Sequence, residues 1–226
     1  MSPELVVCAA PLPGHRRYYQ RLISSWAGRV IAVDAGADLC HVSARPPEVL
    51  VGDFDSISAA AHAYAQDAGA ILRSAPVEKD ITDLDLALTA ARELGSETVV
   101  VTAAWSGRLD HTISAFGSVL ADTALTIDLL DPGMAGRVLD ARARRAVALS
   151  GPGATFSLFS GQSGVSVSCS GVRYPLDHAE LPPLSSLGVS NVVLTEDAFV
   201  VAERGRLLVL SHTVSGIGPA TMVDRR

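Results

Sequence analysis

The sequence pattern of this 226-residue chain changes near residue 137, and that change constrains the fold more than any other feature. Before it, short β-branched or apolar runs alternate with alanine-rich amphipathic segments, such as 58–68 and 80–94. Such alternation is typical of parallel strands with helices on both faces of the sheet. After it, short apolar runs are separated by glycine, serine and proline turns, which is typical of a small β-sandwich. The sequence therefore predicts an α/β fold, a mostly parallel N-terminal sheet with flanking helices, followed by a C-terminal all-β sandwich domain.

The apolar runs place the individual strands. Asp131-Pro132-Gly133 marks the start of the boundary because proline and glycine interrupt regular structure, and we place the two domains at 1–136 and 137–226. The predicted strands of the first domain are 5–9, 30–33, 49–51, 70–72, 98–102 and 125–130, and those of the second are 146–149, 155–159, 165–169, 192–194, 199–202 and 207–210.

Composition limits the partners and the compartment. The net charge of -6, with no basic stripe, argues against nucleic-acid binding as the main function. The apolar runs are too short to span a membrane. Cys8, Cys40 and Cys169 are odd in number and widely separated, matching neither a disulfide framework nor a zinc site. We therefore expect free thiols, a cytoplasmic protein, and no nucleic-acid or membrane partner.

Carboxylates follow several predicted strands of the first domain. They occur at Asp34, in segment 52–56 (Asp53, Asp55), in segment 79–83 (Asp80, Asp83) and in segment 107–111 (Asp110). Because ligands bind at the carboxyl ends of the strands in an open α/β sheet, these side chains are expected to converge. Carboxylates so close together repel one another unless a cation lies between them. The cation we expect is Mg²⁺ carrying phosphates.

Segment 52–56 offers two carboxylates in close succession. In an extended segment Asp53 and Asp55 would point to the same side, and Gly52 lets the backbone turn as it leaves the strand. Mg²⁺ prefers oxygen ligands and usually takes one or two carboxylates, with waters and substrate phosphates completing its shell. The structural alternative is a turn whose Asp and Ser side chains cap a helix beginning near Ser58.

The next acidic segment stands at the start of a predicted helix. Asp80 and Asp83 are three residues apart and so occupy neighbouring positions on one helix face. Alone, either could simply complement the helix dipole. With Asp53 and Asp55 at a neighbouring strand end, Asp83 becomes a candidate third metal ligand.

The fourth segment combines glycine and arginine at the start of a helix. Gly107 and Arg108 could hold a phosphate through backbone N–H groups and a planar guanidinium. The structural alternative gives Asp110 to an N-cap and Arg108 to a surface salt bridge. The chain contains no Walker A loop, no Gly-x-Gly-x-x-Gly fingerprint and no Gly-x-Ser-x-Gly elbow.

Taken in order, six short segments resemble the signature of the thiamine pyrophosphokinase family. They are Val33-Asp34-Ala35-Gly36-Ala37, Gly52-Asp53-Phe54-Asp55-Ser56, Lys79-Asp80-Ile81-Thr82-Asp83, Gly107-Arg108-Leu109-Asp110-His111, Gly171-Val172-Arg173-Tyr174-Pro175-Leu176 and Gly188-Val189-Ser190-Asn191. The resemblance implies a homodimer with its active site at the subunit interface. It also implies transfer of the pyrophosphoryl group of ATP to the hydroxyl of thiamine, giving thiamine diphosphate and AMP.

The resemblance also implies roles for individual residues. The implied metal ligands are Asp53, Asp55 and Asp83, and the implied ATP contacts are Asp34, Gly36, Ser56, Gly107 and Arg108. Ser190 and Asn191, with Asp110, would contact thiamine. Arg108 and Asp110 would line the active centre, and Asp110 competes with Asp80 as the residue that accepts or orients the hydroxyl proton.

Two positions depart from the family pattern. Ala9-Ala10 stands where a glycine pair is common, and Ala115 stands where an asparagine is usual. An aromatic ring is expected to stack on thiamine, and the candidates are Trp105, Phe116, Tyr174 and Phe199. Two other functions are compatible with the sequence: a pyrophosphokinase acting on another alcohol, such as a pterin, and a noncatalytic thiamine-binding protein.

Overall fold

The computed structural model describes residues 2–74, 81–214 and 217–225, and the chain divides into two compact units, 1–127 and 128–226. The boundary predicted at 136–137 falls inside strand β7 (Met134–Asp140). No helix within the described ranges is long and apolar enough to cross a membrane.

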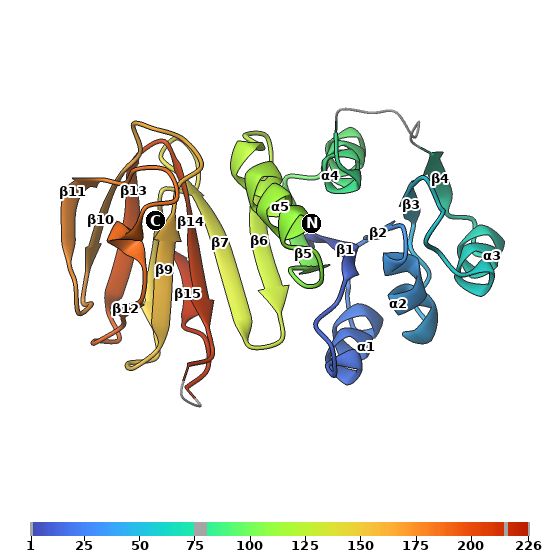
Figure 1. Cartoon of the computed structure of the whole chain (residues 1–226), viewed down its shortest axis with the longest axis horizontal. Helices are drawn as coiled ribbons and strands as arrows, with labels where there is room; N and C mark the ends of the chain where they lie inside the picture. The colour runs from blue at the N-terminus through green and yellow to red at the C-terminus, as the bar shows by residue number, and fades with distance from the viewer. Residues whose placement is uncertain (1, 75–80, 215–216, 226) are drawn as a thin grey trace. The chain divides into compact units, whose positions relative to one another are not determined.

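The first unit is a parallel sheet flanked by helices, as predicted (Figure 1). Its five strands lie in the order β5-β1-β2-β3-β4, and every pair is parallel. The strands are β1 (Glu4–Ala10), β2 (Val30–Val33), β3 (Val49–Gly52), β4 (Ile71–Ser74) and β5 (Thr98–Ala104); the helices are α1 (Arg16–Ser24), α2 (Gly36–Val42), α3 (Ala59–Asp67), α4 (Asp83–Glu93) and α5 (Leu109–Ala121).

The central strands are apolar along their whole length because both faces of the sheet are covered. Every residue of β2 and β3 is buried, and β1 is buried from Glu4 to Cys8. Such continuous runs are typical of parallel strands. The edge strand β4 differs, since Ile71 and Leu72 remain exposed. The core of this unit therefore lies around β1, β2, β3 and β5.

The second unit contains two antiparallel sheets. One has the order β12-β9-β14-β7-β6, and the other β11-β10-β13-β8-β15. The strands are β6 (Thr126–Asp131), β7, β8 (Ala146–Ser150), β9 (Thr155–Phe159), β10 (Ser166–Ser170), β11 (Leu176–Glu180), β12 (Asn191–Val192), β13 (Ala198–Arg204), β14 (Arg206–His212) and β15 (Thr221–Arg225), with a short 3₁₀ helix at Ser186–Gly188. The sequence predicts segment 125–130 as a strand of the first domain, whereas β6, which covers most of it, pairs antiparallel with β7.

One apolar core holds the two sheets of the second unit together. Leu139, Phe156 and Leu207 come from the first sheet, whereas Val167 and Val200 come from the second, and all five belong to one buried cluster. Alternate residues along these strands point inward, as in β8, where Val147 and Leu149 are buried between half-buried neighbours. The predicted β-sandwich is confirmed.

Candidate functional site

The predicted site segments follow the carboxyl ends of the parallel strands. The chain runs outward from β1 through β2 and β3 to β4, and then returns to place β5 on the other side of β1. This reversal of strand order creates the crevice in which open α/β sheets bind ligands. The loops after β1 and β5 are joined there, because the Ser106 hydroxyl donates to the carbonyl oxygens of Ala10 (3.0 Å) and Pro11 (2.7 Å).

Asp34 is the buried member of the acidic group. Its side chain is 8% exposed, and its backbone has a left-handed conformation at φ 43°. One carboxylate oxygen, Oδ1, accepts a hydrogen bond from the Phe54 N–H at 3.2 Å. A buried non-glycine residue with positive φ is unusual and is held there by its surroundings. Asp34 therefore links the end of β2 to the loop after β3.

Two glycines predicted from the family motifs allow this close packing. A Cβ at Gly52 would lie 1.7 Å from Oδ1 of Asp34, and Gly52 has φ 141°. A Cβ at Gly36 would lie 2.1 Å from the carbonyl oxygen of Val7, so α2 starts directly against β1. Both positions require glycine, because any Cβ there would overlap a neighbouring oxygen atom. Gly36 thus has a packing role besides its predicted ATP contact.

Asp53 and Asp55 lie in a turn rather than in the extended segment we expected. Phe54 between them has φ 66°, and its ring lies 5.6 Å from the ring of His62 on α3. The Asp55 N–H donates to Oδ1 of Asp53 at 3.1 Å, and both side chains are exposed. Repulsion by Asp53 is the largest cause that raises the pKa of Asp55, with a smaller contribution from Asp83. The two carboxylates therefore lie close together, as predicted, but because the backbone turns at Phe54 and not because the segment is extended.

The loop after this turn is fixed by a helix cap. The Ser58 hydroxyl accepts from the Ala61 N–H at 3.2 Å, so Ser58 is the N-cap of α3 and also bonds Asp38 of α2. This is the capping that the structural alternative proposed, here made by Ser58. Ser56 is exposed in the same loop. The loop after β3 therefore both brings the carboxylates of Asp53 and Asp55 together and caps α3 through Ser58.

Asp83 is the first residue of α4 and faces Asp34. The predicted helix 80–94 starts at Asp83 because Thr82 forms the N-cap, accepting from the Asp85 N–H at 3.2 Å, while Asp85 accepts from the Thr82 N–H at 3.0 Å. Asp80 and Lys79 lie outside the described residues.

The pKa of Asp34 is raised mainly by burial, and repulsion within this group adds to the shift. Burial, followed by the charges of Asp83 and Asp53, raises the pKa of Asp34 to about 6, against the lowering effect of its hydrogen bond from Phe54. The structure therefore brings together Asp34, Asp53, Asp55 and Asp83, three of them predicted metal ligands. The negative charges of these carboxylates repel one another, and their oxygen atoms are the ligands that a hard cation such as Mg²⁺ prefers.

The carboxylates alone do not enclose a metal ion. Over the ranges 2–74, 81–214 and 217–225, no group of three or more His, Cys, Asp or Glu side chains has the geometry of a metal site. Mg²⁺ commonly binds through only one or two carboxylates, with the other ligands supplied by water and substrate phosphates. The arrangement is thus compatible with a metal that arrives with a phosphorylated substrate.

Arg108 and Asp110 form an ion pair at the start of α5. Arg108 occupies the N-cap position, and its Nε and Nη2 donate to the two carboxylate oxygens of Asp110 at 3.2 and 2.6 Å. Both side chains are largely exposed. The hydrogen bonds from Arg108 are the main reason that the pKa of Asp110 is lowered to about 2. Of the structural alternative considered from the sequence, the surface salt bridge is present, whereas the N-cap position is occupied by Arg108 and not by Asp110.

In the second unit, the predicted substrate residues Ser190 and Asn191 have different surroundings. Ser190 is exposed with φ 59°, and its N–H donates to the hydroxyl of Ser157 at 3.1 Å. Asn191 is 4% exposed. Its Oδ1 accepts from the Tyr174 N–H at 3.0 Å, and its Nδ2 donates to the Tyr174 carbonyl at 2.7 Å. Asn191 therefore fixes the backbone of Tyr174 on both sides.

The aromatic candidates for stacking on thiamine differ in their solvent exposure. The rings of Trp105 and Phe116 stack on each other with centroids 4.6 Å apart, and Phe199 is half-buried in β13. Tyr174 is 60% exposed, although its backbone is held by Asn191. It is the candidate most accessible to a ligand. Ala115, one of the departures from the family pattern, is buried on α5.

Sequence reasoning missed several residues that organise these loops. Ser106 joins the loops after β1 and β5, and Ser157 holds Ser190. Each acts through a single hydroxyl whose partner is distant in sequence, so no local pattern identified either one. The nearest available signal was proximity to a motif, since Ser106 precedes Gly107.

Two family models match the sequence. Residues 20–128 match the catalytic domain of thiamin pyrophosphokinase, and residues 146–207 match its vitamin B1 binding domain. A comparison with curated proteins gave no match.

Solved structures share the fold over almost the whole chain. The thiamine pyrophosphokinase of Bacillus subtilis has a TM-score of 0.74 at 22% identity, with 94% of this chain and 99% of that chain covered. The enzyme of Geobacillus thermodenitrificans has a TM-score of 0.74 at 23% identity, covering 95% and 99%. Yeast thiamin pyrophosphokinase has a TM-score of 0.66 at 11% identity, covering 96% and 88%. Because the two domain models together match most of its length, the chain belongs to the thiamin pyrophosphokinase family.

Proposed function

We propose that this chain is a magnesium-dependent thiamine pyrophosphokinase, which transfers the pyrophosphoryl group of ATP to the hydroxyl of thiamine and releases thiamine diphosphate and AMP. Family membership supports this activity. The structural observation that carries the proposal is the convergence of Asp34, Asp53, Asp55 and Asp83, in which burial and then repulsion by the neighbouring carboxylates raise the pKa of Asp34 to about 6. Such a group is stabilised when a cation carrying phosphates binds to it.

Asp53, Asp55 and Asp83 are proposed to hold the metal. Bound there, Mg²⁺ would act as a Lewis acid on the phosphates and orient them. Asp34 is buried against Gly52 and positions the loop that presents Asp53 and Asp55. The chain's main contribution is alignment and charge, since pyrophosphoryl transfer needs little covalent assistance from protein.

The remaining ATP contacts are proposed from the family motifs. Arg108 is exposed and joined to Asp110 by a solvent-accessible ion pair, which phosphate oxygens can replace with little loss. Its planar guanidinium suits two phosphate oxygens at once. Gly107, with φ 82° and open space around it, lets the backbone approach the phosphates. Asp34, Gly36 and Ser56 complete the proposed ATP contacts.

Asp110 is better suited to attracting a cation than to accepting a proton. A carboxylate whose pKa is about 2 is a weak base at neutral pH. We therefore assign Asp110 to the orientation of the thiamine hydroxyl and to attraction of the cationic vitamin. Asp80 remains the competing candidate for the proton acceptor and lies outside the described residues.

The thiamine contacts are proposed to come from the second unit. Ser190 offers an exposed hydroxyl, and Tyr174 offers an exposed ring that can stack on a cationic heterocycle. Asn191 contributes by holding Tyr174, since its amide is occupied by that residue's backbone. We further propose a homodimer with the active site at the subunit interface. The three cysteines are buried and form no disulfide, which suits the proposed cytoplasmic location.

The alternatives from the sequence are not favoured. A pterin alcohol as acceptor does not explain the match to a vitamin B1 binding domain. A noncatalytic thiamine-binding protein would have no use for the Asp34, Asp53, Asp55 and Asp83 group, because carboxylates kept close together repel one another and destabilise the fold.

The test is a reaction with ATP, thiamine and Mg²⁺, followed by chromatographic measurement of AMP and thiamine diphosphate. Equal amounts of both products are expected, and chelation of Mg²⁺ should stop their formation. Asp53→Ala and Asp83→Ala should each lower turnover at least about a hundredfold, because each removes a direct metal ligand. Asp67→Ala, which changes an exposed acid at the end of α3, is the matched control.

The thermal unfolding midpoint of each variant separates loss of the site from loss of the fold. Removing one of several repelling carboxylates should leave the midpoint of the metal-free protein unchanged or raise it. Full activity in the Asp53→Ala/Asp83→Ala double variant would contradict the metal assignment. Thiamine binding without AMP formation would favour the noncatalytic alternative.

A further inference from the structure

The loops after β1 and β5 begin where the regular pairing of these two strands stops. The strands pair from Glu4 and Val99 onward, shift register between Val7 and Ala10, and make their last pair at Ala10 and Ala104. A register shift of this kind locally disrupts the hydrogen-bond ladder. Beyond this last pair, a side chain links the two loops.

Ser106 makes that link. Its hydroxyl lies 2.7 Å from the carbonyl oxygen of Pro11 and 3.0 Å from that of Ala10, so its single proton is shared between two acceptors of the other loop. The loop after β1 is also held from its other side, because the Leu12 N–H donates at 2.9 Å to the hydroxyl of Tyr19, which is 1% exposed. Ser106 is therefore bonded to a loop that a buried residue already fixes.

The residues that follow Ser106 are held less tightly. A Cβ at Gly107 would meet nothing within 4 Å, and the φ of Gly107 is 82°. Arg108 makes no side-chain cap bond at the start of α5, and its guanidinium, which is 71% exposed, pairs with Asp110 two residues further on. Ser106 is therefore the last residue before Arg108 whose side chain is bonded to another part of the sheet.

We propose that Ser106 is a positioning residue for the nucleotide phosphates. Its hydroxyl holds the loop after β5 against the loop after β1, and so fixes the point from which Gly107 turns and Arg108 reaches the phosphates. A loop held in this way loses less conformational entropy when the nucleotide binds. The inference rests on the proposed function, because Arg108 is a phosphate contact proposed there, and it adds how Arg108 is placed.

The test is a calorimetric titration of the full chain with α,β-methylene-ATP in the presence of Mg²⁺. The α,β bridge of this analogue cannot be cleaved to release AMP, so binding is measured without turnover. Ser106→Ala should weaken binding about three- to tenfold, as expected for loss of an uncharged hydrogen bond. Equal affinity in Ser106→Ala and the unmodified chain would overturn the inference.

A double-mutant cycle decides whether Ser106 acts through Arg108. Arg108→Ala alone should weaken binding about tenfold or more, because it removes charged hydrogen bonds to phosphate. If Ser106 positions Arg108, then Ser106→Ala should cause little further loss in the Arg108→Ala variant, and the two effects are not additive. Additive losses would show that Ser106 does not act through Arg108, and the inference would be wrong.

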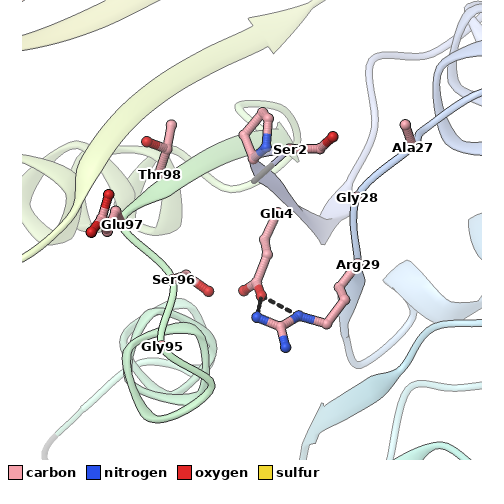
Figure 2. Close-up of a pocket in the computed structure, with 10 residues that line it drawn as sticks. Ser2, Glu4, Ala27, Gly28, Arg29, Gly95, Ser96, Glu97 and Thr98 are labelled. Carbon is pink, nitrogen blue, oxygen red and sulfur yellow. Dashed lines mark hydrogen bonds and ion pairs between the residues drawn. The ribbon is translucent and has the colours of Figure 1, made fainter.

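Two other serines provide matched controls. Ser96 lines a pocket at the amino end of β5 (Figure 2), whereas Ser106 follows the carboxyl end of the same strand, and the Ser96 hydroxyl has no hydrogen-bond partner among the described residues. Ser160 belongs to the second unit, and its buried hydroxyl donates to the carbonyl oxygen of Leu181 at 2.9 Å.

Both control variants should bind the analogue like the unmodified chain. Ser160→Ala should nevertheless lower the thermal unfolding midpoint, because it removes a buried hydrogen bond of the same kind as that of Ser106. If Ser160→Ala weakened nucleotide binding as much as Ser106→Ala, the effect would reflect general loss of stability and would contradict a positioning role.

The proposed function and this inference fail in different ways. If the unmodified chain does not bind the analogue, the proposed nucleotide site is wrong and the role of Ser106 is wrong with it. If the chain binds the analogue but forms no AMP from ATP and thiamine, the proposed reaction is wrong, while the double-mutant cycle still decides the role of Ser106.

Discussion

At the residue scale, Asp34 and Gly52 are in contact with each other. Oδ1 of Asp34 occupies the space that a side chain at position 52 would need. The same oxygen accepts the Phe54 N–H and so fixes the turn that carries Asp53 and Asp55. The position of the carboxylates therefore depends on the absence of one methyl group.

We predict that Gly52→Ala displaces Asp34 and lowers turnover at least about tenfold, while also destabilising the fold by more than the roughly 1 kcal/mol expected from positive φ alone. Gly69→Ala is the matched control, because Gly69 also has positive φ (81°) but has open space around it. Gly69→Ala should lower the free energy of unfolding only by the roughly 1 kcal/mol expected from positive φ, and its activity should be retained. Urea denaturation and the AMP assay measure the two effects, and equal losses in both variants would contradict the contact argument.

The ion pair of Arg108 and Asp110 leads to a prediction about pH. A lowered pKa means that Asp110 stays ionised as the pH falls and gains its proton only near pH 2. We predict that ¹³C carboxyl titration gives a midpoint near that value, and that Arg108→Ala returns it toward the ordinary value of 3.8. A midpoint near 4 in the unmodified chain would show that the pair does not persist in solution.

At the element scale, the start of α4 determines where Asp83 lies. Thr82 and Asp85 form a capping box, so the helix begins at Asp83 and directs this residue toward Asp34. The sequence predicted a start three residues earlier, because acidic residues in the first turn are compatible with more than one helix start. The cap determines which of the two acids becomes the first helical residue.

We predict that Thr82→Ala lowers the free energy of unfolding by about 1 kcal/mol, the usual cost of losing an N-cap. Turnover should also fall, because the first turn of α4 would fray and Asp83 would lose its fixed position. Thr82→Ser keeps the hydroxyl and should restore both properties. Denaturant unfolding and steady-state kinetics provide the measurements; loss of stability with unchanged kcat would show that Asp83 does not need this cap.

Much of the element order could be predicted from the sequence, but the use of particular side chains could not. The carboxylates converge because parallel strands end at one edge, which alternation alone indicates. Asn191 is predicted to contact thiamine, and the sequence did not reveal that its amide bonds the backbone of Tyr174, seventeen positions away. Such a contact depends on how the loop before β11 meets β12, and no single-sequence pattern reveals it.

At the scale of the whole molecule, the net charge of -6 attracts cationic substrates and repels anionic ones. Thiamine is a cation, and the exposed carboxylates of Asp53, Asp55 and Asp110 add to the negative potential near the proposed site. Such a potential favours approach of a cation and is screened by salt.

We predict that KM for thiamine rises about two- to fivefold between low salt and 0.5 M sodium chloride, at saturating ATP and Mg²⁺, while kcat changes little. Sucrose at matched osmolarity controls for general solvent effects. A KM for thiamine that is independent of salt would exclude long-range attraction as part of substrate capture.

The clamp that Asn191 places on Tyr174 has a consequence for local motion. The ring of Tyr174 faces solvent, but its amide proton is held by a buried acceptor. Hydrogen exchange at this amide should therefore be slow, as in a strand, although the residue lies in an exposed loop. A residue whose backbone is already fixed loses only side-chain conformational entropy when a ligand stacks on its ring.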